Sequence, residues 1–67
     1  MVSNIEWVRA RMSVSRFPVV DVYYTSGRMR TFYVDEVPKS VKEFIFFASQ
    51  KITQIDKLWG VETIYKN

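Results

Sequence analysis

The chain has 67 residues, of which 48% are hydrophobic and 16% are aromatic. This length predicts a single domain over residues 1–67, and a chain of this size buries only about 60% of its unfolded surface. Cysteine and histidine are absent, which excludes disulfides, thiolate metal sites and histidine-based catalysis. The apolar content is high for so small an interior, so we expect part of it to serve as a binding surface.

The formal net charge is +3, from 10 Lys and Arg against 7 Asp and Glu. This excess is compatible with anionic partners but does not require them. No apolar run approaches the roughly 20 residues that cross a bilayer, and the N-terminus lacks the pattern of a signal peptide. We therefore expect a soluble cytoplasmic protein with no membrane partner.

Residues 4–15 alternate between apolar and polar side chains, which predicts a β-strand with one apolar face. Ile5 breaks the alternation, and a short helix over residues 3–10 is the competing interpretation. In the strand, one face carries Val8, Ala10, Met12 and Val14, and the other carries Trp7, Arg9, Arg11 and Ser13.

Two further strands are expected over residues 16–24 and 28–34, which are rich in valine, phenylalanine and tyrosine. The segment 25–27 between them reads as a tight turn. A three-residue loop with Gly27 in the left-handed conformation fits this turn best. A two-residue loop is the alternative, and it would exchange the two faces of the second strand because side chains alternate along a strand.

The loop length decides which residues share a face. The three-residue loop pairs Val20 with Phe32 and Val22 with Arg30, whereas the two-residue loop pairs Val22 with Thr31. With the three-residue loop, the helix-facing surface holds Val20, Val22, Phe32 and Val34, and the opposite surface holds Val19, Asp21, Tyr23, Met29, Thr31 and Tyr33.

A helix is expected over residues 40–60. Ser40 and Glu43 form the S-x-x-E pattern of a capping box, and Gly60 is suited to end the helix. A final strand follows over residues 61–65. An apolar stripe along the helix recurs at three- and four-residue steps and consists of Val41, Phe44, Ile45, Ala48, Ile52, Ile55 and Trp59.

These elements predict an α+β fold. The order is β-β-β-α-β, with an antiparallel or mixed sheet and one helix packed on one face. The other face of the sheet is expected to be open.

An enzymatic function is not expected. The close carboxylate pair Asp35 and Glu36 lies in a loop without a histidine or cysteine to complete a catalytic site. Gly27 and Gly60 are the only glycines, which excludes a glycine-rich phosphate loop. We expect no catalytic residues, no metal and no cofactor.

The open face of the sheet is the main candidate site. It would gather aromatic rings, arginines and a methionine, which are residue types enriched at protein-binding hot spots. Two adjacent phenylalanines lie off the apolar stripe of the helix. They either pack under the last strand or form a surface for self-association or for a partner. The candidate partner-binding residues are therefore Trp7, Arg9, Arg11, Tyr23, Met29, Tyr33, Phe46 and Phe47.

The leading hypothesis is a small non-enzymatic binding module that regulates or inhibits a partner protein by occupying its surface. A compact regulator, inhibitor or adaptor of the kind that phages and bacteria make fits this size. The alternative is single-stranded nucleic-acid binding, because bases stack on aromatic rings and arginines contact phosphates. A homodimer stabilised by the excess apolar surface is the third possibility.

Overall fold

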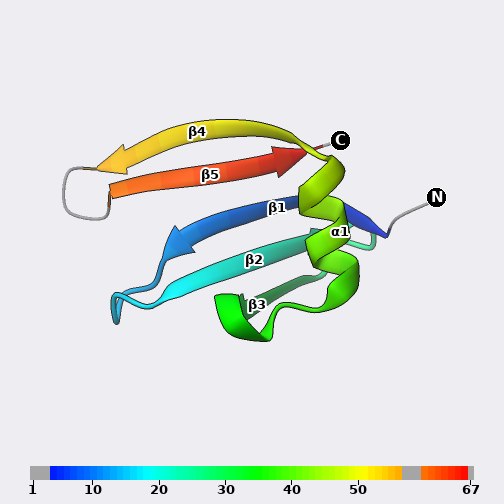
Figure 1. Ribbon diagram of the computed structural model, residues 1–67, viewed down its shortest axis with the longest axis horizontal. Coiled ribbons are helices and arrows are strands. Elements are labelled where there is room, and N and C mark those ends of the chain that lie inside the picture. Colours follow the sequence, from blue (N-terminus) through cyan, green and yellow to red (C-terminus); the bar gives the residue numbers. More distant parts are fainter. Residues whose placement is uncertain (1–3, 57–59, 67) are drawn as a thin grey trace.

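The computed structural model describes residues 4–56 and 60–66, with side chains described for 4–48 and 62–66. Within these residues the chain forms a five-stranded sheet of order β3-β2-β1-β5-β4 in which every neighbouring pair is antiparallel (Figure 1). The elements in chain order are β1 (Ile5–Met12), β2 (Pro18–Tyr24), β3 (Met29–Tyr33), the 3-10 helix η1 (Val34–Glu36), α1 (Lys39–Phe47), β4 (Ser49–Asp56) and β5 (Gly60–Lys66).

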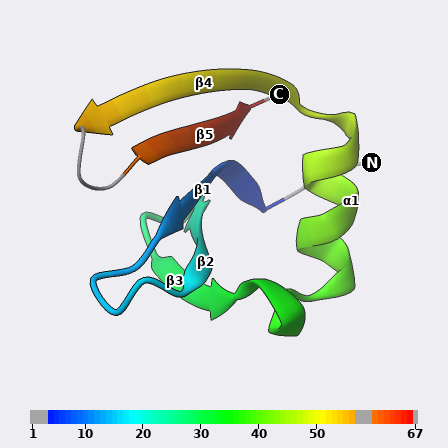
Figure 2. The same ribbon diagram turned by 60° about the vertical axis from the view of Figure 1, so that its left-hand side comes forward.

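The predicted α+β fold is confirmed, with an antiparallel sheet and, in the described part of the chain, one α-helix packed on one face. The last strand, predicted over residues 61–65, is present as β5 and pairs with β1. The connection from β3 through α1 to β4 leads from one edge of the sheet to the other (Figure 2). Four inter-strand spacings amount to about 19 Å, so α1 must run across the strands.

The helix is shorter than predicted. It ends at Phe47, because Ala48 is already extended, and residues 49–56 form β4 instead of the second half of the helix. Residues in this segment include Ile52, Thr53 and Ile55, whose branched Cβ atoms favour strands. Pairing with β5 along the length of β4 therefore overrides the helical spacing of the apolar residues. Gly60, predicted to end the helix, begins β5, and Leu58 and Trp59 lie outside the described residues.

The predicted capping box is also wrong. The helix begins at Lys39 with Pro38 as N-cap, which places Ser40 inside the first turn. The Pro38 carbonyl accepts hydrogen bonds from the Val41 and Lys42 backbone N–H groups, each at 3.1 Å. Proline is suited to this place because its fixed φ, here −61°, leads into the first turn without requiring a free N–H.

A β-bulge in β1 explains why Ile5 breaks the alternation. Ile5 lies opposite Tyr24 and Trp7 lies opposite Tyr23, so β1 has one residue more than β2 over this step. The extra residue, Glu6, lets Ile5 point into the core while Trp7 points to the other face. The strand prediction holds, and the alternative helix over residues 3–10 is excluded.

The β2–β3 hairpin has the three-residue loop that the sequence favours. Val20 lies opposite Phe32 and Val22 opposite Arg30. The Tyr24 N–H donates to the Arg28 carbonyl at 2.9 Å, and Gly27 has a φ of 89°, as the left-handed position requires. Val34 departs from the prediction because it begins η1 and is exposed instead of facing the helix.

The β1–β2 hairpin contains a turn that the sequence did not indicate. Both flanking strands were predicted to run further, to Ser15 and from Arg16. The structure ends β1 at Met12 and closes the hairpin by a hydrogen bond from the Ser13 N–H to the Phe17 carbonyl at 2.8 Å. Arg16 takes the left-handed position with a φ of 64°. A non-glycine residue rarely adopts this conformation, so composition alone did not reveal the turn.

The core lies between α1 and one face of the sheet. Val41 and Phe44 from the helix pack against valines of β1 and β2, and Ile45 and Ala48 pack at the margin. The first half of the predicted apolar stripe is thus confirmed. The buried cluster consists of Ile5, Val8, Val20, Val22, Val41 and Phe44.

Candidate functional site

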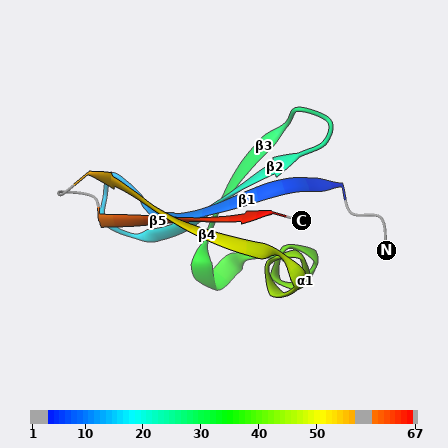
Figure 3. The same cartoon turned by 90° about the horizontal axis from the view of Figure 1, so that it is seen from above.

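The sheet face opposite α1 carries six of the eight predicted site residues. In Figure 3 the helix lies on one side of the sheet, and among the described elements none covers the other side. Antiparallel pairing aligns the polar face of β1 with the matching faces of β2 and β3. We call this surface the open face; its predicted members are Trp7, Arg9, Arg11, Tyr23, Met29 and Tyr33.

Trp7 and Tyr23 form an aromatic pair at one end of the open face. The two residues are directly opposite on β1 and β2, and their rings stack with centroids 3.8 Å apart and planes 7° apart. Both side chains are half-buried, and the guanidinium of Arg9 lies 5.9 Å from the Tyr23 centroid. One ring face of each residue is therefore occupied by its neighbour.

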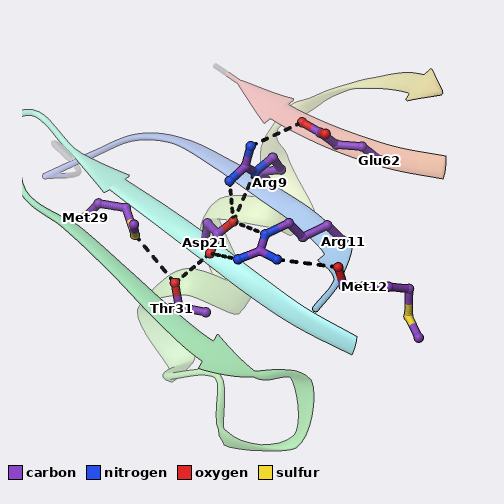
Figure 4. Close-up of polar contacts among 7 residues, drawn as sticks. All are labelled: Arg9, Arg11, Met12, Asp21, Met29, Thr31 and Glu62. Atoms are coloured by element: carbon purple, nitrogen blue, oxygen red, sulfur yellow. Dashed lines mark hydrogen bonds and ion pairs between the residues drawn. The ribbon is translucent and has the colours of Figure 1, made fainter. Parts of the chain in front are cut away.

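Asp21 lies at the centre of the open face and collects hydrogen bonds from both neighbouring strands (Figure 4). Arg9 donates to Oδ2 from Nε at 3.0 Å and from Nη2 at 2.8 Å, and Arg11 donates to both carboxylate oxygens. The Thr31 hydroxyl donates to Oδ1 at 2.6 Å from β3. Asp21 is 0% exposed although no described element covers this face, because these side chains enclose it.

The network shifts the protonation equilibria of its members. Burial alone raises the pKa of Asp21, but hydrogen bonds from Arg11, Thr31 and Arg9 outweigh it, so the pKa lies below its ordinary value. The hydrogen bond to Asp21 raises the pKa of Arg11. Asp21 is therefore ionised and fully hydrogen-bonded at neutral pH, which identifies it as a structural anchor of the face.

The arginines of the open face are already paired. Nη1 of Arg9 also lies 3.8 Å from Oε1 of Glu62 on β5. The guanidinium groups of Arg9 and Arg11 therefore face the carboxylates of Asp21 and Glu62. The charges in this region balance. Arg9 and Arg11 thus hold the sheet together, and their availability for a partner is less than the sequence suggested.

The exposed part of the open face lies toward β3. Met29 is 49% exposed and Tyr33 is 55% exposed. Tyr33 contacts Phe17 edge to face, with centroids 6.4 Å apart. Beneath them Val19, opposite Tyr33, is buried and lines a hollow of about 290 Å³ together with Phe17 and Tyr33. The rest of its lining is mostly polar and consists of Arg11, Ser13, Ser15, Thr31 and Phe32. This end of the face is accessible and presents apolar side chains beside polar ones.

Phe46 and Phe47 lie apart from the open face, at the end of α1. They are 81% and 80% exposed, and their rings meet edge to face with centroids 5.0 Å apart. The interpretation that they pack under the last strand is therefore wrong. The two rings form a second exposed apolar surface on α1, and this helix lies on the other side of the sheet from the open face (Figure 3).

Sequence reasoning placed Asp21 and Thr31 on the open face but did not include them among the site residues. The available signal was an acidic residue within the valine-rich run of β2, opposite a strand that carries two arginines. Phe17 was also missed, because its place beside Tyr33 depends on the turn at Arg16.

In the part of the chain that the structure describes, no helix is long and apolar enough to cross a membrane. Among the same residues, no group of three acidic, cysteine or histidine side chains is placed to hold a metal ion. Comparisons with protein-family models, with curated proteins and with solved structures found no match to this chain.

Proposed function

We propose that the protein is a small non-enzymatic binding module that regulates or inhibits a partner protein by occupying its surface. The observation that carries this proposal is the exposure of Met29 and Tyr33 at the β3 side of the open face. Methionine and tyrosine in such positions are typical of protein interfaces. A cytoplasmic location is part of the proposal, since a chain without cysteine gains nothing from an oxidising compartment.

The helix offers a second contact for a partner. Phe46 and Phe47 expose about four-fifths of their surface, and burying a phenylalanine side chain stabilises a complex by about 1.5–3 kcal/mol. The pair does not belong to the hydrophobic cluster around Val41 and Phe44. Its removal should therefore affect binding without weakening the fold.

The nucleic-acid alternative has less support. On the open face, where this alternative places its site, phosphate contacts need free cationic groups, whereas Arg9 and Arg11 both donate to Asp21. Base stacking needs free ring faces, and the stack between Trp7 and Tyr23 already covers one face of each ring.

The test is affinity capture from a lysate of the host organism, with and without nuclease, followed by quantitative mass spectrometry. The bait is the wild-type chain or one of two double variants, M29S with Y33S or F46S with F47S. Loss of a binding hot spot costs about 2 kcal/mol, so one double variant should bind the partner roughly thirtyfold more weakly and recover less of it.

Circular dichroism of each variant serves as the control for folding, because all four side chains are exposed. If both double variants recovered every captured protein as well as the wild-type chain does, the result would contradict the proposal. Captured material that is lost on nuclease treatment would favour the nucleic-acid alternative.

A further inference from the structure

The outer edge of β3 has backbone groups available for pairing. β3 is the first strand of the sheet order and pairs with β2 on one side only. In an antiparallel pair, successive residues direct their N–H and C=O groups alternately to the two sides of the strand. Because the Tyr24 N–H donates to the Arg28 carbonyl, Arg28, Arg30 and Phe32 point their backbone groups toward β2.

It follows that Met29, Thr31 and Tyr33 direct their backbone N–H and C=O groups outward. No described element pairs with these groups. Their side chains belong to the open face, and Met29 and Tyr33 offer apolar surface there. An added strand would thus find hydrogen-bonding partners at every second residue and an apolar strip on one side.

The opposite side of the same edge is basic. Arg28 and Arg30 are both exposed, and neither forms an ion pair with a described residue. The Arg30 guanidinium lies 5.3 Å from the Phe32 centroid, which holds it along the edge. Both arginines line an open hollow of about 520 Å³ beside Tyr24. In contrast to Arg9 and Arg11, these two cations are free for a partner.

We propose that the β3 edge binds an extended acidic segment of the partner protein as an additional antiparallel strand. This inference rests on the proposed function and specifies how the partner is recognised. Residues opposite Met29, Thr31 and Tyr33 would place apolar side chains on the open face. Partner residues that lie opposite Arg30 and Arg28 would place carboxylates on the helix-bearing side of the sheet. The recognised pattern is an alternation of apolar and acidic residues.

A second copy of the chain fits this edge less well. Antiparallel pairing of two β3 strands about Thr31 would bring two copies of Arg28 and Arg30 onto one side of the joined sheet. Like charges placed together in this way oppose association. Charge complementarity therefore favours an acidic partner over self-association.

The probe is a fluorescein-labelled heptapeptide in which valine alternates with glutamate, with fluorescence anisotropy as the readout. Binding should be saturable. It should weaken about tenfold or more for the chain with R30E, because a like charge replaces the attraction. The matched control K42E makes the same charge change on the exposed surface of α1 and should bind as the wild type does.

Backbone methylation separates strand addition from plain charge attraction. In the antiparallel arrangement the valine N–H groups face β3 and the glutamate N–H groups face away. Peptides N-methylated at the valines should lose binding, whereas peptides N-methylated at the glutamates should retain it. Amide NMR shifts should concentrate on Met29, Thr31 and Tyr33.

Several results would overturn the inference. They are absence of binding, equal binding by a lysine-containing peptide, indifference to R30E, or equal binding after valine methylation. A dimer in sedimentation that R30E does not affect and the peptide does not compete with would assign the edge to a second copy instead. None of these results affects the lysate capture, so the proposed function could stand when the strand-addition mode fails.

Discussion

Trp7 and Tyr23 stack nearly parallel across the β1–β2 pair, with ring centroids 3.8 Å apart. The contact joins the residue that follows the β1 bulge to the end of β2. It thus anchors one end of the open face, while Asp21 anchors the middle.

The aromatic pair should contribute a measurable coupling energy. A double-mutant cycle of W7A and Y23A, measured by urea denaturation with circular dichroism, should give about 1 kcal/mol beyond the loss of buried area. Trp7 and Tyr33 make a matched control pair on the same face. They lie opposite Tyr23 and Val19, which are four residues apart on β2, so the two rings are too far apart to stack. Their cycle should be additive, and a coupling of similar size there would contradict the assignment.

Replacing Asp21 should destabilise the protein more than replacing any other carboxylate among the described residues. The variant D21N leaves Arg9 and Arg11 side by side without their shared anion, and breaking a buried ion pair costs about 3 kcal/mol or more. The exposed Asp35 in η1 provides the control, because D35N should change the free energy of unfolding by less than about 0.5 kcal/mol. Similar urea midpoints for D21N and the wild type would contradict the structural role.

Acid should remove the contribution of Asp21 to stability. Its folded pKa lies below the ordinary value of 3.8, because the hydrogen bonds from Arg11, Thr31 and Arg9 outweigh burial. The contribution is complete above this value, where both states are ionised. As the pH falls below 3.8, the unfolded chain takes up the proton first, and stability declines until the folded carboxyl is also protonated.

Thermal unfolding between pH 5 and about pH 2 tests this linkage. The difference in Tm between the wild type and D21N should shrink as the pH falls. A constant difference over this range would show that the folded pKa is not lowered.

The hairpin loop at Arg16 should gain stability from glycine. The left-handed conformation costs a non-glycine residue about 1–2 kcal/mol, and glycine adds about 0.5–1 kcal/mol of chain entropy to the unfolded state. R16G should therefore raise the free energy of unfolding by up to about 1 kcal/mol. S15G, at a loop position without a positive φ, should give no gain, and equal effects of both variants would contradict the argument.

Local chemistry made much of the fold predictable. The alternation in β1 and the Gly27 turn fixed the faces of three strands, because each depends on a short stretch of chain. Residues 49–56 were misassigned because the apolar residues there have helical spacing, while the structure pairs them with β5, the next strand along the chain. The β-branched residues Ile52, Thr53 and Ile55 did favour a strand, but propensity alone does not decide against a helical spacing of apolar residues.

The face on which several candidate residues lie was predictable, but the contacts of these residues were not. Periodicity placed Trp7, Arg9 and Arg11 on one face, as the structure has them. It could not reveal that both arginines bind Asp21, because that depends on cross-strand geometry with a partner 10 or 12 residues away. Nor could it show that Arg28 and Arg30 form no ion pair with a described residue.

The bulge at Glu6 reverses which face of the sheet the odd-numbered residues of β1 point to. Ile5 and Trp7 have the same parity in the sequence, yet they serve opposite sides of the sheet. A single strand of eight residues therefore places Ile5 in the core and Trp7 in the aromatic stack of the open face, although only one residue separates them. Deleting one residue here would restore regular alternation along β1. Either Ile5 would then leave the core, or Trp7 would no longer stack on Tyr23.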